Sequence, residues 1–385
     1  MLKKNNYLLD IYLNRGLEIV KGRGCWLYDK NKKKYLDMMS NYGANILGYN
    51  YKKIIYTIKK QATELINLHG SFLNPIRNLL AKELIKKSGI NGKVIFLNSG
   101  SEAIEAAIKF ALISTKKREI IAFKNSYHGK TLGALSLTYG EKYKKGIENF
   151  LIRVNFVKYN DISEFKKILN DNIDNIGIVI IEPIQGDGGI YLASKTFLEE
   201  LYLLCKKNNI ILIIDEIQTG FGRTGKLFCY EWYNIQPNIV CLGKGIAGGL
   251  PLSAVIVENE IAKNIPKFYH TSTFGGNILA CSVSLKILKI LNKKFLDSVF
   301  KKGEFLKKEL NKIKHPLIKE VRGKGLMIGI EVYDKRSEIL KLLQENSVLA
   351  IPAGENVIRL LPPLIISKKE LGFFIKIFKK VLKNV

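Results

Sequence analysis

Short runs of branched and aromatic residues alternate with helical patterns through the middle of the chain. The runs have the length of buried strands, and they are Lys93–Leu97, Glu119–Phe123, Ile176–Ile181, Ile210–Ile214 and Ile239–Leu242. Stretches with helical spacing, such as Phe197–Lys207, lie between them and are bounded by Gly, Asn and Pro. This alternation predicts an α/β fold with a mostly parallel sheet and helices on both of its faces.

The two ends of the chain have a different pattern. Residues Trp26–Asp37 are typical of a hairpin with a lysine-rich turn, and the C-terminal part mixes helices with short strands such as Leu326–Val332 and Val357–Leu360. The simplest arrangement is a large central domain with a small α+β domain built from both chain ends. We therefore predict that residues 51–290 form the large domain and that residues 1–50 and 291–385 form the small one.

The charge balance is strongly basic. There are 62 Lys and Arg against 34 Asp and Glu, a net charge of +28, which raises the question of a nucleic-acid partner. Only nine of the basic residues are arginine, whereas recognition of phosphates and base edges favours arginine's planar fork. Because the lysines are spread along the chain and accompany many Ile, Asn and Tyr residues, we attribute them to a coding bias and predict no nucleic-acid partner.

Composition also restricts the class and location of the protein. Hydrophobic residues make up 47% of the chain, which excludes global disorder. The five cysteines form no C-x-x-C pair, which favours reduced thiols and predicts neither a disulfide framework nor a metal site. No segment has 18 consecutive apolar residues, and Asp10 and Glu18 interrupt the N-terminal segment, so neither a membrane span nor a signal peptide is predicted. We expect a cytoplasmic enzyme.

Three places carry side chains suited to chemistry at strand ends, where α/β sheets bind ligands. One buried run ends in Asp215, another ends near Lys244, and Gly100 and Ser101 open a helical pattern. Taken singly, these are ordinary features: a turn former, a solvated lysine and a helix cap. Together they provide a helix N-terminus for a phosphate, a carboxylate for a pyridine nitrogen and a lysine for an imine. Pyridoxal 5′-phosphate requires these three partners.

Longer motifs narrow the class further. In chain order they are NSGSEAIEAA, YHGKTLGALS, EPIQGDGG, IIDEIQTGFGRTGK, GKGIAGGLP, TSTFGGN, VRGKGLMIGIE and VIRLLPPL. On these segments the chain resembles the class III aminotransferases of the ornithine and acetylornithine type, over nearly its whole length. The resemblance implies the fold-type I architecture of pyridoxal-phosphate enzymes, with a large, mostly parallel sheet domain and a small α+β domain.

The resemblance also implies a role for each residue that matches a family motif. Lys244 would form the Schiff base and transfer the proton, and Asp215 would pair with the pyridine nitrogen. The other matching residues would bind the phosphate (Gly100, Ser101), approach the 3-oxygen of the ring (Gln218), stack on the ring (Tyr127) and support this network (Glu182). For Glu182 a purely structural role remains an alternative.

Some residues depart from the family pattern where the substrate is expected. Lys130 stands where the acetylornithine-type enzymes carry an arginine that binds the substrate's carboxylate, and lysine lacks the bidentate geometry. Asp187 stands in place of a glutamate that pairs with an arginine, here Arg359, and releases it for a carboxylate co-substrate. Tyr42 stands where ornithine aminotransferases also carry tyrosine, so a free diamino acid remains open as the substrate.

The segment Thr271–Asn277 resembles the family's phosphate-contacting loop. In that loop, the threonine that matches Thr273 reaches the cofactor of the neighbouring subunit, and Ser272 is assigned to the substrate. An ordinary glycine-rich loop is the alternative. The resemblance therefore implies a homodimer with shared sites.

The reaction implied is ping-pong transamination with glutamate and 2-oxoglutarate. We predict N2-acetylornithine and its semialdehyde as the other pair, in arginine biosynthesis. The motifs also resemble lysine/ornithine enzymes whose substrate is attached to an acidic amino-group carrier protein, so that branch and ornithine itself remain alternatives. A nucleic-acid-binding protein with a vestigial enzyme fold is the remote alternative, and Lys244 and Asp215 argue against it.

Overall fold

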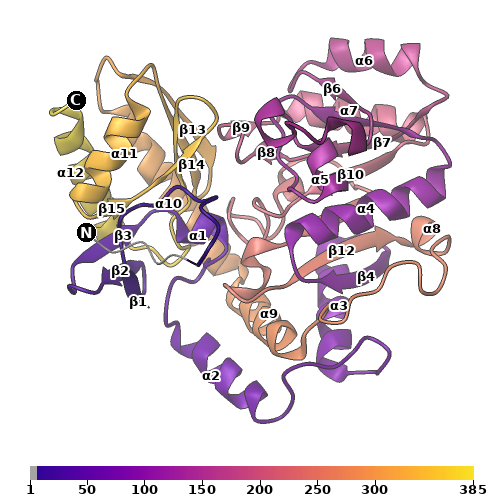
Figure 1. The fold of residues 1–385 in the computed structure, drawn as a ribbon, viewed down its shortest axis with the longest axis horizontal. Helices are drawn as coiled ribbons and strands as arrows, with labels where there is room; N and C mark the ends of the chain where they lie inside the picture. Colours follow the sequence, from indigo (N-terminus) through magenta and orange to yellow (C-terminus); the bar gives the residue numbers. More distant parts are fainter. Residues whose placement is uncertain (1–6) are drawn as a thin grey trace.

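The computed structural model describes residues 7–385, so the predicted segment 1–50 lies within the described residues only from residue 7 on. Its largest sheet has seven strands in the order β4-β12-β11-β10-β7-β5-β6 (Figure 1). Their bounds are β4 Gly92–Leu97, β5 Glu119–Phe123, β6 Val154–Val157, β7 Ile176–Ile181, β10 Ile211–Asp215, β11 Ile239–Leu242 and β12 Ser253–Glu258. The five predicted runs are all strands of this sheet, each within one residue of its predicted bounds.

One strand departs from the expected direction. Strand β12 pairs antiparallel with both of its neighbours, β11 and β4, whereas the pairs β10–β11, β10–β7, β5–β7 and β5–β6 are parallel. The sheet is therefore mixed and mostly parallel. The apolar run of β12 was not among the predicted strands, and neither was β6.

The two faces of this sheet belong to two hydrophobic cores, because side chains alternate along each strand. Helix α4 (Gly100–Thr115) packs on the face that carries Ile178 and Ile213. The opposite face, with Val179 and Leu212, lies in the larger core. That core is covered by α3 (Pro75–Ser88), α6 (Ile162–Asp171), α7 (Lys195–Lys207) and α9 (Ile278–Ile290). Helices therefore cover both faces of the sheet, as the alternation predicted, and the edge strands β4 and β6 stay partly exposed.

The remaining strands form smaller sheets beside the large one (Figure 1). The first has the order β1-β2-β3-β15, with β1 Ile19–Arg23, β2 Trp26–Asp29, β3 Lys34–Asp37 and β15 Val348–Leu349. The second has the order β13-β14-β17-β16, with β13 Ile318–Lys324, β14 Met327–Val332, β16 Ile351–Ala353 and β17 Val357–Leu360. Because β3 pairs with β15, the two chain ends share one sheet. The predicted hairpin is β2 and β3.

Helices pack on these smaller sheets and complete the fold. They are α10 (Lys293–Asn311), α11 (Arg336–Glu345) and α12 (Lys368–Leu382). The helices α1 (Ser40–Gly43) and α2 (Lys52–Ala62) follow strand β3 in the chain. The short helices α5 (Leu132–Leu137) and α8 (Asn259–Ala262) lie between or after strands of the large sheet in the chain. A short hairpin, β8 (Ile184–Gln185) and β9 (Tyr191–Leu192), leaves the end of β7. Among the helices of residues 7–385, none combines the length and the apolar composition that a membrane span requires.

Candidate active site

The carboxylate of Asp215 lies buried at the end of β10, with 4% of the residue exposed. Its Oδ2 lies 2.7 Å from Nδ1 of His128, and its Oδ1 accepts a hydrogen bond of 3.0 Å from the Ile217 amide. These contacts fix the carboxylate in one orientation, because both of its oxygens are engaged. His128 belongs to the YHG motif, but no role was predicted for it.

Glu182 lies directly after β7 and is buried. One carboxylate oxygen accepts from the Tyr127 amide at 2.9 Å and the other from the Gly186 amide at 3.0 Å. Burial raises the pKa of Glu182 to about 7, His128 counteracts this shift, and the charge of Asp215 adds to it. Asp215, His128 and Glu182 are called the pocket floor below.

Lys244 follows β11, with a positive φ of 40°. Its side chain lines the cavity above the pocket floor, and within the described chain its ammonium forms no hydrogen bond or ion pair. Burial lowers the pKa of Lys244, while the charge of Asp215 opposes that shift. An amine with a lowered pKa is more often neutral, which is the form that attacks a carbonyl carbon.

The N-terminus of α4 closes the other end of the cavity. Ser99 caps the helix by accepting from the Glu102 amide at 3.3 Å, while the amides of Gly100 and Ser101 have no acceptor in the part of the chain described. A Cβ at Gly100 would lie 2.9 Å from Ile217, so glycine permits the close approach of these two segments. Free amides at a helix N-terminus form an anion site.

These groups surround one cavity of about 200 Å³. It is lined by Ser99, Gly100, Ser101, Tyr127, His128, Gly129, Glu182, Asp215, Ile217, Gln218 and Lys244. The structure thus brings together the predicted phosphate amides, the pyridine-nitrogen carboxylate, the lysine, Tyr127 and Gln218. Within residues 7–385 these groups fit pyridoxal phosphate: amides without an acceptor for its phosphate, a buried carboxylate for its ring nitrogen and an amine without a partner for its aldehyde.

Arg359 lies on β17 beside this cavity, with 2% of the residue exposed. Its guanidinium donates to Gln218 Oε1, to Asp187 Oδ1 and to the Pro352 carbonyl, each at 3.3 Å. Burial lowers the pKa of Arg359, and the charge of Asp187 opposes that shift. Asp187 in turn accepts at 3.2 Å from the hydroxyl of Tyr143, a residue without a predicted role. Arg359, Asp187 and Tyr143 are called the gate below.

Two further residues with a predicted substrate role, Lys130 and Tyr42, lie next to the gate. The Lys130 ammonium is exposed and lies 5.0 Å from the centre of the Tyr143 ring. Tyr42 is 46% exposed, with its ring centre 5.6 Å from the Arg359 guanidinium. Neither residue lines the cavity beside Lys244. Both lie next to members of the gate, and the surface around the gate is called the entrance below.

Ser272 and Thr273 do not line the cavity of their own chain. Ser272 Oγ accepts from Asn98 Nδ2 at 3.1 Å and from the Gly275 amide at 3.0 Å, so it holds its own loop in shape. Thr273 is exposed at the surface. Their predicted contacts with the substrate and with a neighbouring subunit's cofactor stay predictions.

A mostly parallel sheet whose strand ends carry a buried carboxylate and a lysine, opposite the N-terminus of α4, is the arrangement of a pyridoxal-phosphate-dependent enzyme of fold type I. The sequence profile described as "Aminotransferase class-III" matches residues 12–382. The chain belongs to the class III aminotransferases and is a pyridoxal-phosphate-dependent transaminase.

Known relatives and solved structures match this chain over nearly its whole length. The chain is 38% identical to an acetylornithine aminotransferase of Aquifex aeolicus, covering 98% of this chain and 100% of that one. It is 40% identical to a [LysW]-aminoadipate semialdehyde/glutamate semialdehyde transaminase of Sulfurisphaera tokodaii, covering 94% of each. An ornithine aminotransferase structure from Toxoplasma gondii, with partial occupancy of PLP at its active site, has a TM-score of 0.92 at 29% identity, covering 98% of this chain and 92% of that one.

Proposed function

We propose that the protein exchanges an amino group between glutamate and 2-oxoglutarate on one side and N2-acetylornithine and its semialdehyde on the other, as a step of arginine biosynthesis. The gate is the observation that carries this proposal. Arg359 is a buried cation beside the cavity, and the carboxylate that covers it, Asp187, is 37% exposed in its side chain. A buried arginine whose paired carboxylate can move away suits an enzyme that must bind two differently charged substrates in turn.

The two substrates differ in the group next to the reacting amine. Glutamate reacts at its α-amine, so its α-carboxylate would bind Arg359 and its side-chain carboxylate would bind Lys130. N2-acetylornithine reacts at its terminal amine, which has no neighbouring carboxylate, so Asp187 would stay on Arg359. Its own carboxylate would then bind Lys130. Named relatives at 37–38% identity over their full length support this substrate.

The pocket residues supply the remaining parts of the reaction. When bound, the cofactor supplies an electron-withdrawing ring that stabilises negative charge on the substrate carbon. The amides of Gly100 and Ser101 would bind its phosphate, and Asp215 would keep its ring nitrogen protonated. Tyr127 and Gln218 would contact the ring. Lys244 would hold the cofactor at rest and carry the proton between carbons during transfer.

A substrate attached to an acidic amino-group carrier protein is the second candidate, and the charge of the entrance favours it. The ammonium groups of Lys130 and Lys142 lie 5.0 Å and 4.7 Å from the centre of the Tyr143 ring. Neither lysine forms an ion pair within the described residues, so both are available to an acidic partner. The [LysW]-linked relative of Sulfurisphaera tokodaii supports the same candidate.

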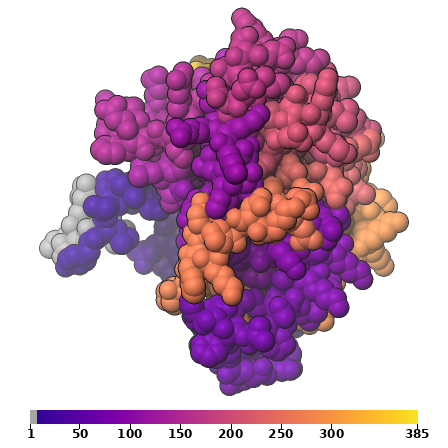
Figure 2. All heavy atoms as spheres, turned by 90° about the vertical axis from the view of Figure 1, so that its right-hand side faces the viewer, coloured from indigo at the N-terminus to yellow at the C-terminus, as the bar shows by residue number. Residues whose placement is uncertain are grey.

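We also propose a homodimer that shares its active sites through Thr273. The surface around Thr273 is formed by the segments that contain Leu73 and Phe274. Both side chains are apolar and exposed, Leu73 at 94% and Phe274 at 62%. Arg77 donates to the Gly276 carbonyl at 3.1 Å and joins the two segments, which lie at the surface in Figure 2, in purple and orange. Lys244→Ala and a disabling change at Thr273, each inactive alone, should regain activity when co-refolded, because one site of a mixed dimer is intact. No recovery despite proven subunit exchange would contradict the shared site.

A coupled 2-oxoglutarate assay of the purified, cofactor-loaded protein tests the substrate. It compares N2-acetylornithine, ornithine, N-succinyl-diaminopimelate, 4-aminobutyrate and a carrier-bound lysine. We expect the highest kcat/KM with N2-acetylornithine. A clear preference for the carrier-bound amine would replace it with the second candidate, and a preference for 4-aminobutyrate would contradict both. The predicted cytoplasmic location stays a prediction.

A further inference from the structure

Asp187 lies between two hydrogen-bond donors. Its Oδ1 accepts from Nη2 of Arg359 at 3.3 Å, and its Oδ2 accepts from the hydroxyl of Tyr143 at 3.2 Å. Both contacts are longer than usual for a charge-assisted hydrogen bond. Neither donor therefore holds the carboxylate tightly, and a small movement toward one of them weakens the contact with the other.

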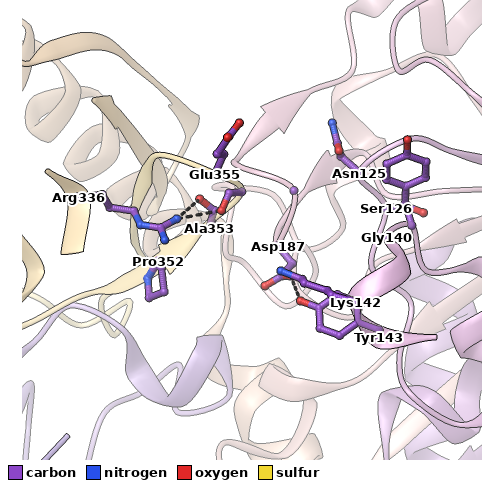
Figure 3. A pocket seen from close by; sticks show the side chains of 13 residues that line it. Asn125, Ser126, Gly140, Lys142, Tyr143, Asp187, Arg336, Pro352, Ala353 and Glu355 are labelled. Atoms are coloured by element: carbon purple, nitrogen blue, oxygen red, sulfur yellow. Dashed lines mark hydrogen bonds between the residues drawn. The ribbon is translucent and has the colours of Figure 1, made fainter. Parts of the chain in front are cut away.

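Of the two charged members of this gate, Asp187 is the one with room to move. Arg359 is buried on a strand and also donates to Gln218 and to the Pro352 carbonyl. Asp187 lies in the turn between β8 and β9 and lines a hollow of about 480 Å³. Figure 3 shows Asp187 and Tyr143 side by side at this hollow, joined by the dashed hydrogen bond.

We propose that Tyr143 is a specificity-determining positioning residue, which holds Asp187 away from Arg359 while the co-substrate's carboxylate occupies that arginine. The proposal rests on the function proposed above. With an ω-amine donor, Asp187 covers Arg359. With glutamate, Asp187 moves toward the hollow and keeps the hydroxyl of Tyr143 as its partner, so its charge is not left without a donor.

The surroundings of Tyr143 suit this role. Burial, followed by the charge of Asp187, raises the pKa of Tyr143 to about 12, so its hydroxyl remains a donor at neutral pH. The ammonium groups of Lys130 and Lys142 lie 5.0 Å and 4.7 Å from the centre of its ring. A carboxylate that moves toward Tyr143 therefore enters a region of positive charge and does not need to be exposed fully to water.

Tyr143→Phe tests the proposal because it removes only the hydroxyl. Each half-reaction is measured separately, with glutamate alone and with N2-acetylornithine alone, by the change in visible absorbance of the bound cofactor. We expect the ratio of the second-order rate constants of the two half-reactions, glutamate over N2-acetylornithine, to fall on the order of tenfold, mainly through weaker apparent binding of glutamate. The matched control is Tyr139→Phe, because Tyr139 lines the same hollow and its hydroxyl has no hydrogen-bond partner within residues 7–385.

A second background separates positioning from a structural effect. Once Asp187→Ala has removed the carboxylate, Tyr143→Phe should no longer change the substrate ratio, because the two residues act together. Calorimetric titration with glutarate, an unreactive dicarboxylate, should show weaker binding to Tyr143→Phe than to the wild type and no such difference in the Asp187→Ala background. An equal loss with both substrates, or an effect that persists without Asp187, would overturn the proposal.

The failure of this inference can be distinguished from the failure of the proposed function. If the wild type converts glutamate and N2-acetylornithine but Tyr143→Phe leaves their ratio and glutarate binding unchanged, only the role of Tyr143 is wrong. If the wild type converts neither substrate, the proposed function is wrong. In that case, weaker glutarate binding to Tyr143→Phe would still support Tyr143 as the partner of Asp187, and unchanged binding would overturn that role too.

Discussion

The pocket floor and the gate lie next to each other and are built in different ways. In the floor, Asp215 ends one strand and Glu182 follows another strand of the same sheet, and their hydrogen bonds are 2.7 to 3.0 Å long. In the gate, Arg359 comes from a smaller sheet and Asp187 from a hairpin turn, and the contacts of Asp187 are 3.2 and 3.3 Å long. The same types of charged group are thus held tightly in one region and loosely in the other.

This difference matches what each region has to do. A cofactor that stays bound through every turnover needs a fixed carboxylate and fixed amides, since preorganised charges lose nothing to rearrangement during the reaction. Two substrates of different charge that enter in turn need a contact that can break. We therefore expect substitutions in the floor to affect every substrate alike, and substitutions in the gate to affect substrates unequally.

The largest effect is expected for Lys244→Ala, directly above the floor. Loss of the proton-transfer group alone should lower kcat about 10²- to 10⁴-fold with every amino donor. The variant should still bind the cofactor through the helix N-terminus and Asp215, as an equilibrium titration would show. Lys124→Ala is the control, because Lys124 pairs with Glu164 at 3.3 Å outside the cavity. Full activity of Lys244→Ala would contradict the assignment.

The next effect concerns the stability of the folded protein and arises at Glu216, the residue after Asp215. Burial raises the pKa of Glu216 from 4.5 to about 7. The folded state binds this proton more tightly, so the stability it contributes is present below pH 4.5 and is lost as the pH rises through 7. Between pH 4.5 and 8 the free energy of unfolding of the cofactor-free protein should therefore fall by about 3 kcal/mol through this group. We expect Glu216→Gln to lack that part of the pH dependence. Urea denaturation of both proteins between pH 4.5 and 8 measures it. Parallel curves would show that Glu216 titrates normally.

His128→Ala should weaken the floor without changing which substrate is preferred. Removing the group that contacts Asp215 at 2.7 Å should cost about 2 kcal/mol, or roughly thirtyfold in the dissociation constant of the cofactor. His128→Asn, which retains a donor, should recover part of the loss. If the ratio of kcat/KM values for glutamate and N2-acetylornithine changes instead of the cofactor affinity, His128 belongs functionally to the gate.

Lys130→Ala should give the smallest of these effects, because this cation is exposed. Loss of a charge-assisted contact costs about 1.5 kcal/mol at the low end, or roughly tenfold in KM for the amino donor. Lys130→Arg should lower KM or leave it unchanged, because arginine binds a carboxylate with two donors. Steady-state kinetics of both variants measure this. If Lys130→Ala leaves KM unchanged, the carboxylate is bound elsewhere.

Asp215 of the floor could be placed from the residues themselves, whereas Arg359 and Asp187 of the gate were paired only through the family resemblance. Asp215 and Lys244 follow apolar runs that become neighbouring strands β10 and β11, and parallel strand ends meet at one edge of a sheet. The contact between His128 and Asp215 was missed, although the YHG motif was recognised, because it depends on the path of a loop 87 positions away in the chain. Likewise, nothing in the local pattern around Tyr143 indicates that its hydroxyl meets Asp187.

The fold shows the same limit. Apolar runs predict the strands of the large sheet well, because a strand that is buried on both faces needs apolar residues at nearly every position. The direction of β12 cannot be read from its residues Ser253–Glu258, because parallel and antiparallel central strands bury similar side chains. Pairing β3 with β15 joins residues more than 300 positions apart, and only the expectation of a domain from both chain ends anticipated it.

The central claim is that Lys244 is the residue that binds the cofactor covalently, and one measurement tests it most directly. The protein is loaded with pyridoxal phosphate, reduced with borohydride to fix the cofactor to its lysine, digested and mapped by mass spectrometry. We predict that the modified peptide contains Lys244 and that prior addition of glutamate, which releases the lysine, prevents the labelling. A label at another lysine, or labelling of Lys244 that glutamate leaves unchanged, would contradict it.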